Sequence, residues 1–333
     1  MPWRTRLWDS GGLEPAAVSK PRGRTAGRPS ARPAVSLDLA IALAAALALT
    51  CTAACPARRG PDRGKESRME TKTATVKGRK ILYRESGAGY PVLLVHGNTG
   101  SSLWWTRVGE VAGARLTAPD LPNFGGSDRL DPAEAPGSSD IDLYADYLIA
   151  FAEDLGLFRP VLVGHSLGGA VAISALVRRP ELWASAVLVD SAPPGGLVTP
   201  EAHYAAIERF KTDRALLRSA LGAVCPAIDD PAFLDRLTDE ALRMNPESFA
   251  GNARALARFD RSGDCGRYPG PVLVLWGRRD AIVTEAMARD TAAAFPRGSL
   301  RILENVGHSA MVEDPAAFRE ILAGVVRRAD PGY

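Results

Sequence analysis

A serine flanked by glycines lies between a strand-like run and a helix-like run of the sequence. The segment at 164–168 reads Gly-His-Ser-Leu-Gly, with Ser166 at its centre, and it follows the apolar run at 161–163. A chain that passes directly from a strand to a helix must turn sharply. Glycines suit such a turn, because side chains at those positions would collide with neighbouring backbone. A serine in this context, after a strand and before a helix, is typical of a nucleophile elbow. The pattern therefore predicts Ser166 as a nucleophile for acyl transfer.

A serine hydroxyl needs a general base, and histidine is the usual one at neutral pH. The chain has four histidines. His308 lies in a loop after the last strand-like run and before the last helical run, where it can be brought beside Ser166. His96 follows an early strand-like run, and we expect it to bond loop backbone. The sequence thus predicts His308 as the base.

The base in turn needs a carboxylate that fixes its tautomer and stabilises its charged form. Asp280 follows the apolar run at 271–276, and Asp190 ends the run before it. The order serine, aspartate, histidine along the chain favours Asp280 as the partner of His308. Asp190 stays the alternative.

An acyl-transfer site also needs donors for the oxyanion, each contributing about 3 to 4 kcal/mol to lowering the barrier. The N–H of Leu167, at the start of a helix, is one predicted donor. The second is predicted to be the N–H of Asn98, in the loop after the apolar run at 92–95.

The elements that must position these residues alternate between strand-like and helical patterns. Continuous apolar runs are typical of strands buried on both faces of a parallel sheet. They lie at 91–97, 160–164, 186–190, 271–277 and, more weakly, 300–303. Helical patterns lie at 141–155, 167–179, 283–295 and 316–327, the last preceded by Asp314 and Pro315. A hairpin is expected from 71–76 and 80–85. The alternation predicts a doubly wound α/β sheet.

One stretch breaks the alternation. Residues 195–270 contain helical patterns at 201–221, 231–244 and 246–258 and no long strand-like run. We expect a helical cap over the carboxyl edge of the sheet, where ligands bind in such folds. The sheet core would then comprise residues 71–194 and 271–330.

Five ordered motifs within residues 75–330 resemble the α/β-hydrolase superfamily, in particular its capped serine hydrolases and esterases. They are the His-Gly at 96–97, the segment 120–128, the Gly-His-Ser-Leu-Gly-Gly at 164–169, the Gly-Arg-Arg-Asp at 277–280 and the Gly-His at 307–308. The resemblance implies a mostly parallel, eight-stranded sheet with the cap between strands 6 and 7. It implies that Asp120 and Gly125 belong to a structural loop after the fourth strand, and it implies no metal or organic cofactor.

The segment 96–102, with Trp104 and Trp105, is also similar to haloalkane dehalogenases, whose asparagine at this place helps to hold a halide. Those enzymes have an aspartate nucleophile followed by tryptophan, where this chain has Ser166 and Leu167. An ether formed from a serine would not be hydrolysed readily, so dehalogenation is disfavoured. The side chain of Asn98 remains available to a polar group of a substrate.

The function expected from these residues is cleavage of a small carboxylic ester through an acyl-enzyme. A C–C bond hydrolase or a lactonase with the same triad is the alternative within the superfamily. A receptor of the same fold that binds a ligand and barely turns it over is an alternative of another class.

The N-terminal residues have the order of an export signal. Residues 1–54 carry seven basic and three acidic residues, and an uncharged apolar stretch at 39–54 precedes Cys55. Lipidation of Cys55, plain secretion, an uncleaved anchor and no export are the alternatives, with a periplasmic or cell-envelope location expected. Residues 55–70 are polar and rich in breakers, so we expect a flexible tether.

The overall charge does not suggest a polyanionic partner. The 333-residue chain has a formal net charge of +3, and 46% of its residues are hydrophobic. Residues 55–333 include 34 basic and 35 acidic residues. We therefore expect no nucleic-acid binding.

Two cysteines, Cys225 and Cys265, lie in the expected folded part of the chain. Export would permit a disulfide between them. The other interpretation is that both are small buried side chains.

Overall fold

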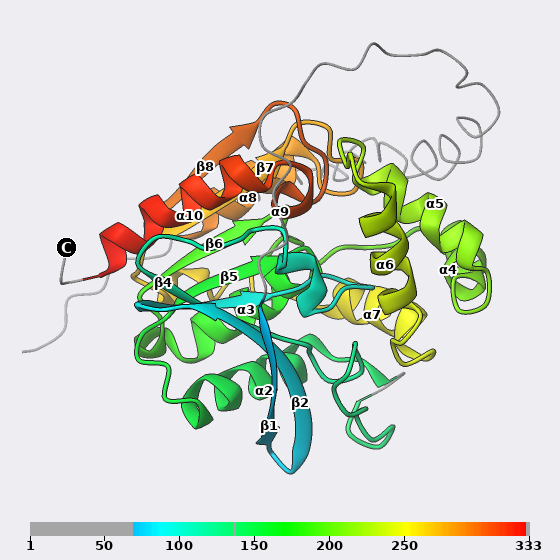
Figure 1. Ribbon diagram of the computed structural model, residues 1–333, viewed down its shortest axis with the longest axis horizontal. Coiled ribbons are helices and arrows are strands. Elements are labelled where there is room, and N and C mark those ends of the chain that lie inside the picture. Colours follow the sequence, from blue (N-terminus) through cyan, green and yellow to red (C-terminus); the bar gives the residue numbers. More distant parts are fainter. Residues whose placement is uncertain (1–68, 136–137, 331–333) are drawn as a thin grey trace, which may run out of the picture. The chain divides into compact units, whose positions relative to one another are not determined.

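The computed structural model describes residues 69–135 and 138–330, and these contain one eight-stranded sheet (Figure 1). Its order is β1-β2-β4-β3-β5-β6-β7-β8. The strands are β1 Glu70–Val76, β2 Arg79–Gly87, β3 Tyr90–Val95, β4 Ala114–Pro119, β5 Val161–His165, β6 Ser185–Val189, β7 Val272–Gly277 and β8 Gly298–Leu303. Only the pairs β1–β2 and β2–β4 are antiparallel, so the expected mostly parallel sheet is confirmed.

The central strands are formed by the apolar runs of the sequence. Every residue of β5 and β6 is buried, as expected for strands covered on both faces. The strand β4 was implied only by the resemblance, because Arg115 and Thr117 interrupt its apolar pattern. The expected hairpin joins β1 to β2 through Lys77 and Gly78, which both have positive φ.

Helices cover the sheet on both faces. In Figure 1, α2 and α3 lie on one side of the sheet and α10 on the other. The four helices with a predicted counterpart are α2 Ile141–Asp154, α3 Leu167–Arg178, α8 Glu285–Ala294 and α10 Pro315–Ala329. Their ends differ from the predicted ranges by at most two residues. Asp314 is the N-cap of α10, since its side chain accepts a hydrogen bond from the N–H of Ala317 (3.0 Å).

The segment between β6 and β7 contains helices and no strand in the described structure. We call the four helices together the helical segment: α4 Tyr204–Arg209, α5 Arg214–Val224, α6 Pro231–Ala241 and α7 Ser248–Arg258. The prediction of one helix over 201–221 was wrong. The helix is interrupted before Asp213, whose side chain accepts from the N–H of Leu216 (2.9 Å) and begins α5. Arg214 and Arg218 of α5 then form ion pairs with Asp235 of α6.

The helical segment contacts the loops that follow the strands. The N–H of Asn245 donates to the carbonyl of Asn123 (2.8 Å), in the loop after β4. The side chain of Asn252, in α7, donates to the side-chain oxygen of Asn98 (2.8 Å), in the loop after β3. These bonds place the helical segment against the carboxyl ends of β3 and β4.

The predicted leader 1–54, Cys55 and most of the predicted tether 55–70 lie outside the described residues. The first described strand begins at Glu70. Among the helices of the described ranges, none is long and apolar enough to cross a membrane. Cys225 and Cys265 are both buried free thiols, so the structure has no disulfide between them, and burial raises the pKa of Cys265 to about 11.

Replacement of Asp314 by alanine should remove the N-cap of α10. The N–H of Ala317 would lose its side-chain acceptor, so we expect the free energy of unfolding to fall by about 0.5 to 2 kcal/mol. Urea unfolding followed by circular dichroism measures the change. Glu320→Gln, an exposed substitution on the same helix, is the control and should leave stability nearly unchanged. Equal stability of Asp314→Ala and wild type would show that this cap is not needed.

Candidate active site

Ser166 lies in a strained turn between β5 and α3. Its φ of 53° and ψ of −119° lie in a region that non-glycine residues rarely adopt. The turn requires glycine at its flanks. A Cβ on Gly164 would lie 2.4 Å from the carbonyl oxygen of Gly168, and a Cβ on Gly168 would lie 2.3 Å from that of His96. The motif predicted from the sequence is therefore a nucleophile elbow, with Ser166 partly exposed.

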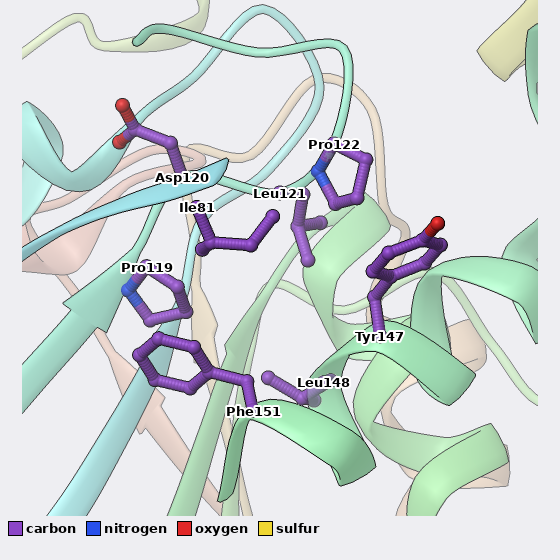
Figure 2. A pocket seen from close by; sticks show the side chains of 8 residues that line it. All are labelled: Ile81, Pro119, Asp120, Leu121, Pro122, Tyr147, Leu148 and Phe151. Atoms are coloured by element: carbon purple, nitrogen blue, oxygen red, sulfur yellow. The ribbon is translucent and has the colours of Figure 1, made fainter. Parts of the chain in front are cut away.

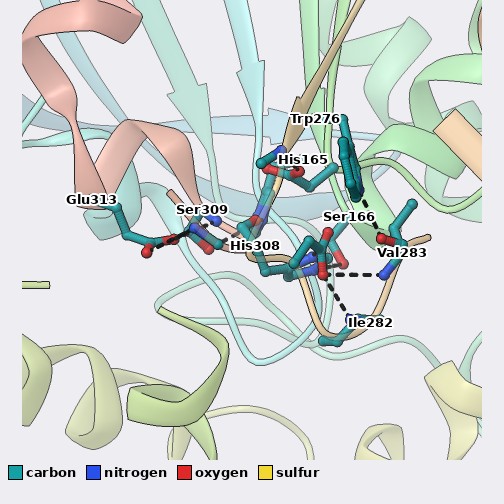
Figure 3. A network of polar contacts seen from close by, with 12 residues as sticks. His165, Ser166, Trp276, Ile282, Val283, His308, Ser309 and Glu313 are labelled. Carbon is teal, nitrogen blue, oxygen red and sulfur yellow. Dashed lines mark hydrogen bonds and ion pairs between the residues drawn. The ribbon is translucent and has the colours of Figure 1, made fainter. Parts of the chain in front are cut away.

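The structure brings Ser166, His308 and Asp280 into one chain of hydrogen bonds. The distance from Ser166 Oγ to His308 Nε2 is 2.9 Å, and the distance from His308 Nδ1 to Asp280 Oδ2 is 2.8 Å (Figure 3). The side chains of His308 and Asp280 are only 5% and 0% exposed. The other carboxylate oxygen, Asp280 Oδ1, accepts from the N–H groups of Ile282 (2.7 Å) and Val283 (3.1 Å). These two bonds fix the orientation of the Asp280 carboxylate.

Backbone hydrogen bonds join the loop that carries Asp280 to the one that carries His308. The N–H of Arg278 donates to Leu303 O (2.9 Å), and the N–H of Arg279 donates to Val306 O (3.0 Å). The two loops approach so closely that a Cβ on Gly277 would lie 1.9 Å from the carbonyl oxygen of Gly307. This contact places the loop of Asp280 directly against the loop of His308.

Asp190, the alternative carboxylate, does not contact His308. It is buried at the end of β6, and its Oδ1 accepts from the N–H of Gly277 (2.8 Å). Burial raises the pKa of Asp190 well above its usual range, and the nearby charge of Asp280 raises it further. The hydrogen bond to His308 Nδ1 is made by Asp280, so the structure favours Asp280 as the partner of His308.

The predicted oxyanion donors lie on the two segments that meet at Ser166. Leu167 begins α3 directly after the serine. The loop after β3 touches the serine, since a Cβ on Gly97 would lie 2.9 Å from the Cβ of Ser166. Asn98 follows in that loop, and its side-chain oxygen accepts from the N–H of Thr99 and from Asn252. These bonds orient the Asn98 amide; the oxyanion roles of Asn98 and Leu167 stay predictions.

The other residues singled out from the sequence have structural partners. His96 Nε2 accepts from the N–H of Leu121 (3.0 Å), and Nδ1 contacts Gly97 O (2.8 Å), so His96 connects two loops as expected. The carboxylate of Asp120 accepts from the N–H groups of Ser102 (2.7 Å) and Gly126 (2.9 Å). Asp120 thus supports the loop after β4, as the resemblance implied.

Sequence reasoning missed the role of the His165 ring. Its Nε2 contacts the carbonyl oxygen of His308 at 2.8 Å, so Nε2 carries the proton and donates. Burial lowers the pKa of His165 well below its usual value, with the nearby His308 acting in the same direction. The ring stacks on Trp104, with 5.7 Å between centroids. No sequence pattern signals this role, because it depends on a contact across 143 residues.

A buried polar chain extends from Asn98 into the protein, and it was also missed. Asn252 donates to Asn98 and accepts from the hydroxyl of Tyr144 (3.0 Å). Asn252 and Tyr144 are both fully buried. The chain connects α7 and α2 to the loop beside Ser166.

A small apolar hollow lies between β2, the segment after β4 and α2 (Figure 2). It is hardly larger than a water molecule. Its lining residues are Ile81, Pro119, Asp120, Leu121, Pro122, Tyr147, Leu148 and Phe151. None of the site residues described above except Asp120 borders it. Within residues 69–135 and 138–330, no three His, Cys, Asp or Glu side chains are placed to share a metal ion.

Comparison with known proteins agrees with this fold and motif. The model of the alpha/beta hydrolase family matches residues 92–321. The chain belongs to this family. An uncharacterised protein of Mycobacterium tuberculosis is 28% identical over 283 residues, which cover 77% of this chain and 81% of the relative.

Two further similar proteins have names that state an activity. A 2-hydroxymuconate semialdehyde hydrolase of Pseudomonas sp. (strain CF600) is 27% identical over 264 residues, covering 74% of this chain and 90% of the relative. The solved structure of a candidate aryl esterase from Burkholderia cenocepacia is 25% identical, with a TM-score of 0.69, and covers 78% of this chain and 99% of that one. The proteins similar to this chain are thus named for different hydrolytic activities.

Asp190→Asn should remove the contribution of Asp190 to the pH dependence of the free energy of unfolding. The native state keeps a proton on Asp190 at pH values where the unfolded state has lost it. Stability therefore falls as the pH rises above about 4, by at most about 1.4 kcal/mol per pH unit from this group. Asparagine keeps an oxygen for the Gly277 N–H and cannot ionise, so the variant should gain stability relative to wild type as the pH rises.

Urea unfolding of both proteins between about pH 4 and 8 measures this difference. Glu320→Gln removes an exposed carboxylate and is the control, for which no such gain is expected. A difference between Asp190→Asn and wild type that stays constant with pH would contradict the raised pKa of Asp190.

Proposed function

We propose that this α/β hydrolase is a serine hydrolase that cleaves small carboxylic esters. The observation that carries the proposal is the pair of distances that join Ser166 Oγ to His308 Nε2 and His308 Nδ1 to Asp280 Oδ2, 2.9 and 2.8 Å. A serine hydroxyl bonded to a histidine that is itself oriented by a buried carboxylate is arranged for nucleophilic attack.

The reaction would proceed through an acyl-enzyme. Ser166 Oγ attacks the carbonyl carbon of the ester while its proton passes to His308 Nε2. The carbonyl oxygen becomes an anion and accepts hydrogen bonds from the N–H groups of Leu167 and Asn98. His308 then gives the proton to the leaving alcohol as the C–O bond breaks. Water, deprotonated by His308, attacks the acyl group, releases the acid and restores Ser166.

Asp280 would act through His308. Its carboxylate accepts the Nδ1–H, so the Nε2 lone pair faces the serine, and it stabilises the positive charge that His308 gains in the transition state. The N–H groups of Ile282 and Val283 keep the carboxylate in this orientation. Because His308 and Asp280 are already in contact and buried, they need not rearrange when positive charge develops on His308.

Cleavage of a C–C bond or of a lactone is the second candidate. The first of these is favoured by the relative named 2-hydroxymuconate semialdehyde hydrolase, which is 27% identical. In all three reactions the serine attacks a carbonyl carbon. Asn252 orients the side chain of Asn98 by donating to its oxygen, and the Asn98 NH₂ group would then contact a polar group of the substrate.

Ser166→Ala should lower kcat/KM for a short p-nitrophenyl ester by at least about a thousandfold, because alanine has no nucleophile. Labelling by a fluorophosphonate probe should disappear with it. Ser262→Ala, which changes an exposed serine bonded to Asp260, is the matched control and should behave as wild type. Hydrolysis by Ser166→Ala at the wild-type rate would refute the assignment.

A substrate panel separates the two candidates and the receptor. Esters of increasing acyl length, lactones and vinylogous diketones would be compared by kcat/KM on the purified enzyme. The ester proposal requires multiple turnovers on esters at a higher kcat/KM than on the other two classes. A wild-type protein that is labelled by the probe but turns over none of them would behave as a receptor.

We also propose that the protein is exported and held at the cell envelope through Cys55. The proposal rests on the order of basic, apolar and small residues in the sequence before Cys55. The full chain, expressed in a bacterium, should incorporate a labelled fatty acid and fractionate with membranes. Cys55→Ser should lose the label, whereas Cys51→Ser, inside the apolar stretch, should keep it. Absence of label from the wild-type chain would contradict lipidation.

A further inference from the structure

The backbone around His308 is held by three consecutive N–H groups. The N–H of Gly307 donates to both carboxylate oxygens of Glu313 (3.0 and 2.9 Å), and the N–H of Ser309 donates to one of them (3.0 Å). Between them, the N–H of His308 donates to the carbonyl oxygen of Val224 (3.0 Å), at the end of α5. The Glu313 carboxylate therefore bonds the backbone on both sides of His308 (Figure 3).

The carbonyl group of His308 also forms a hydrogen bond. It accepts from Nε2 of His165, in the elbow, at 2.8 Å. The two peptide groups of His308 thus have no freedom to rotate without breaking a hydrogen bond. Its side chain is then directed to Ser166 and Asp280 by its two ring nitrogens.

Glu313 also joins the loop to the helical segment. Its Oε2 accepts from the N–H of Ala227 (2.9 Å), which follows α5. The contact between the two parts is close, since a Cβ on Gly307 would lie 2.4 Å from the ring of Pro226. Burial raises the pKa of Glu313, whereas these N–H groups and the nearby His308 act against that rise. Its cluster of donors suits an ionised carboxylate, which offers two oxygens and no proton.

We propose that Glu313 is a positioning residue for the base His308, and that it links the position of the base to the helical segment through Ala227. The inference rests on the proposed function, since it assigns to His308 the role of base. Glu313 acts through backbone: it fixes where the peptides of 307–309 lie, and these fix where Nε2 lies relative to Ser166 Oγ. A displacement of about 1 Å at such a site costs on the order of a hundredfold in rate.

Glutamine cannot replace this carboxylate. Its amide has one accepting oxygen, and its NH₂ group would face an N–H donor of Gly307, Ser309 or Ala227. At least one donor would lose its partner and the loop would shift. Because the binding surface for the substrate is unchanged, the loss should fall on kcat and not on KM.

The test compares Glu313→Gln with Glu320→Gln, the same substitution at an exposed position of α10. We expect Glu313→Gln to lower kcat for a p-nitrophenyl ester by about tenfold to a hundredfold, with KM changed by less than about threefold. Labelling by a fluorophosphonate should slow to a similar degree, and circular dichroism should be that of wild type. Glu320→Gln should match wild type. A folded Glu313→Gln with wild-type kcat would overturn the proposal.

Glu313→Ala provides a second test, and it applies also if the glutamine variant does not fold, since alanine places no donor against the N–H groups. Its kcat should fall similarly and should recover in part when formate is added, because formate supplies a carboxylate of suitable size to the vacated space. A folded variant that loses kcat and is not rescued would assign to Glu313 a merely structural role. If the wild type itself neither turns over esters nor is labelled, the proposed function fails, and not this inference alone.

Discussion

The strained turn at Ser166 is the constraint on which the rest of the site depends. A backbone at φ of 53° and ψ of −119° costs about 1 to 3 kcal/mol and persists only where the surroundings enforce it. Here the surroundings are extensive. The carbonyl oxygen of Ser166 accepts from the N–H groups of Gly169 (2.9 Å) and Ala192 (3.1 Å), and its own N–H donates to Val189 O (3.0 Å). The turn holds the Ser166 hydroxyl at the carboxyl end of β5, where it contacts His308.

The parallel sheet converts this local turn into a site. Strands β3, β5, β6, β7 and β8 lie side by side, so the loops after them meet at one edge although they are far apart in the chain. Ser166 and His308 are 142 residues apart and come within 2.9 Å. Loop positions at an edge are not rigid by themselves. Rigidity comes from bonds between loops, such as those from Arg278 and Arg279 to the loop before His308 and those of Glu313.

The features that the sequence allowed us to predict are those set by local structure. The elbow, the apolar strands and the Asp314 cap are each encoded within a few consecutive residues, so their patterns can be read directly. The break before Asp213 was missed because the apolar periodicity continues through it, and ion pairs to Asp235 position α5. His165 and Glu313 were missed for a related reason. The His165 ring bonds backbone 143 residues away, and Glu313 bonds the distant Ala227 as well as the nearby Gly307 and Ser309. The spacing of residues in one sequence does not reveal which side chains bond backbone in this way.

The choice between Asp190 and Asp280 shows how tertiary electrostatics decides what spacing leaves open. Two carboxyl groups buried at neighbouring strand ends cannot both be ionised without a large penalty, since water no longer screens them. Asp280 receives two N–H groups on one oxygen and the His308 ring on the other, whereas the bond found for Asp190 is one N–H, that of Gly277. These contacts make Asp280 the partner of His308, whereas burial raises the pKa of Asp190. Asp190 instead accepts from the N–H of Gly277, the last residue of β7, and Asp280 follows three residues later. The buried Asp190 thus supports the start of the loop that carries Asp280.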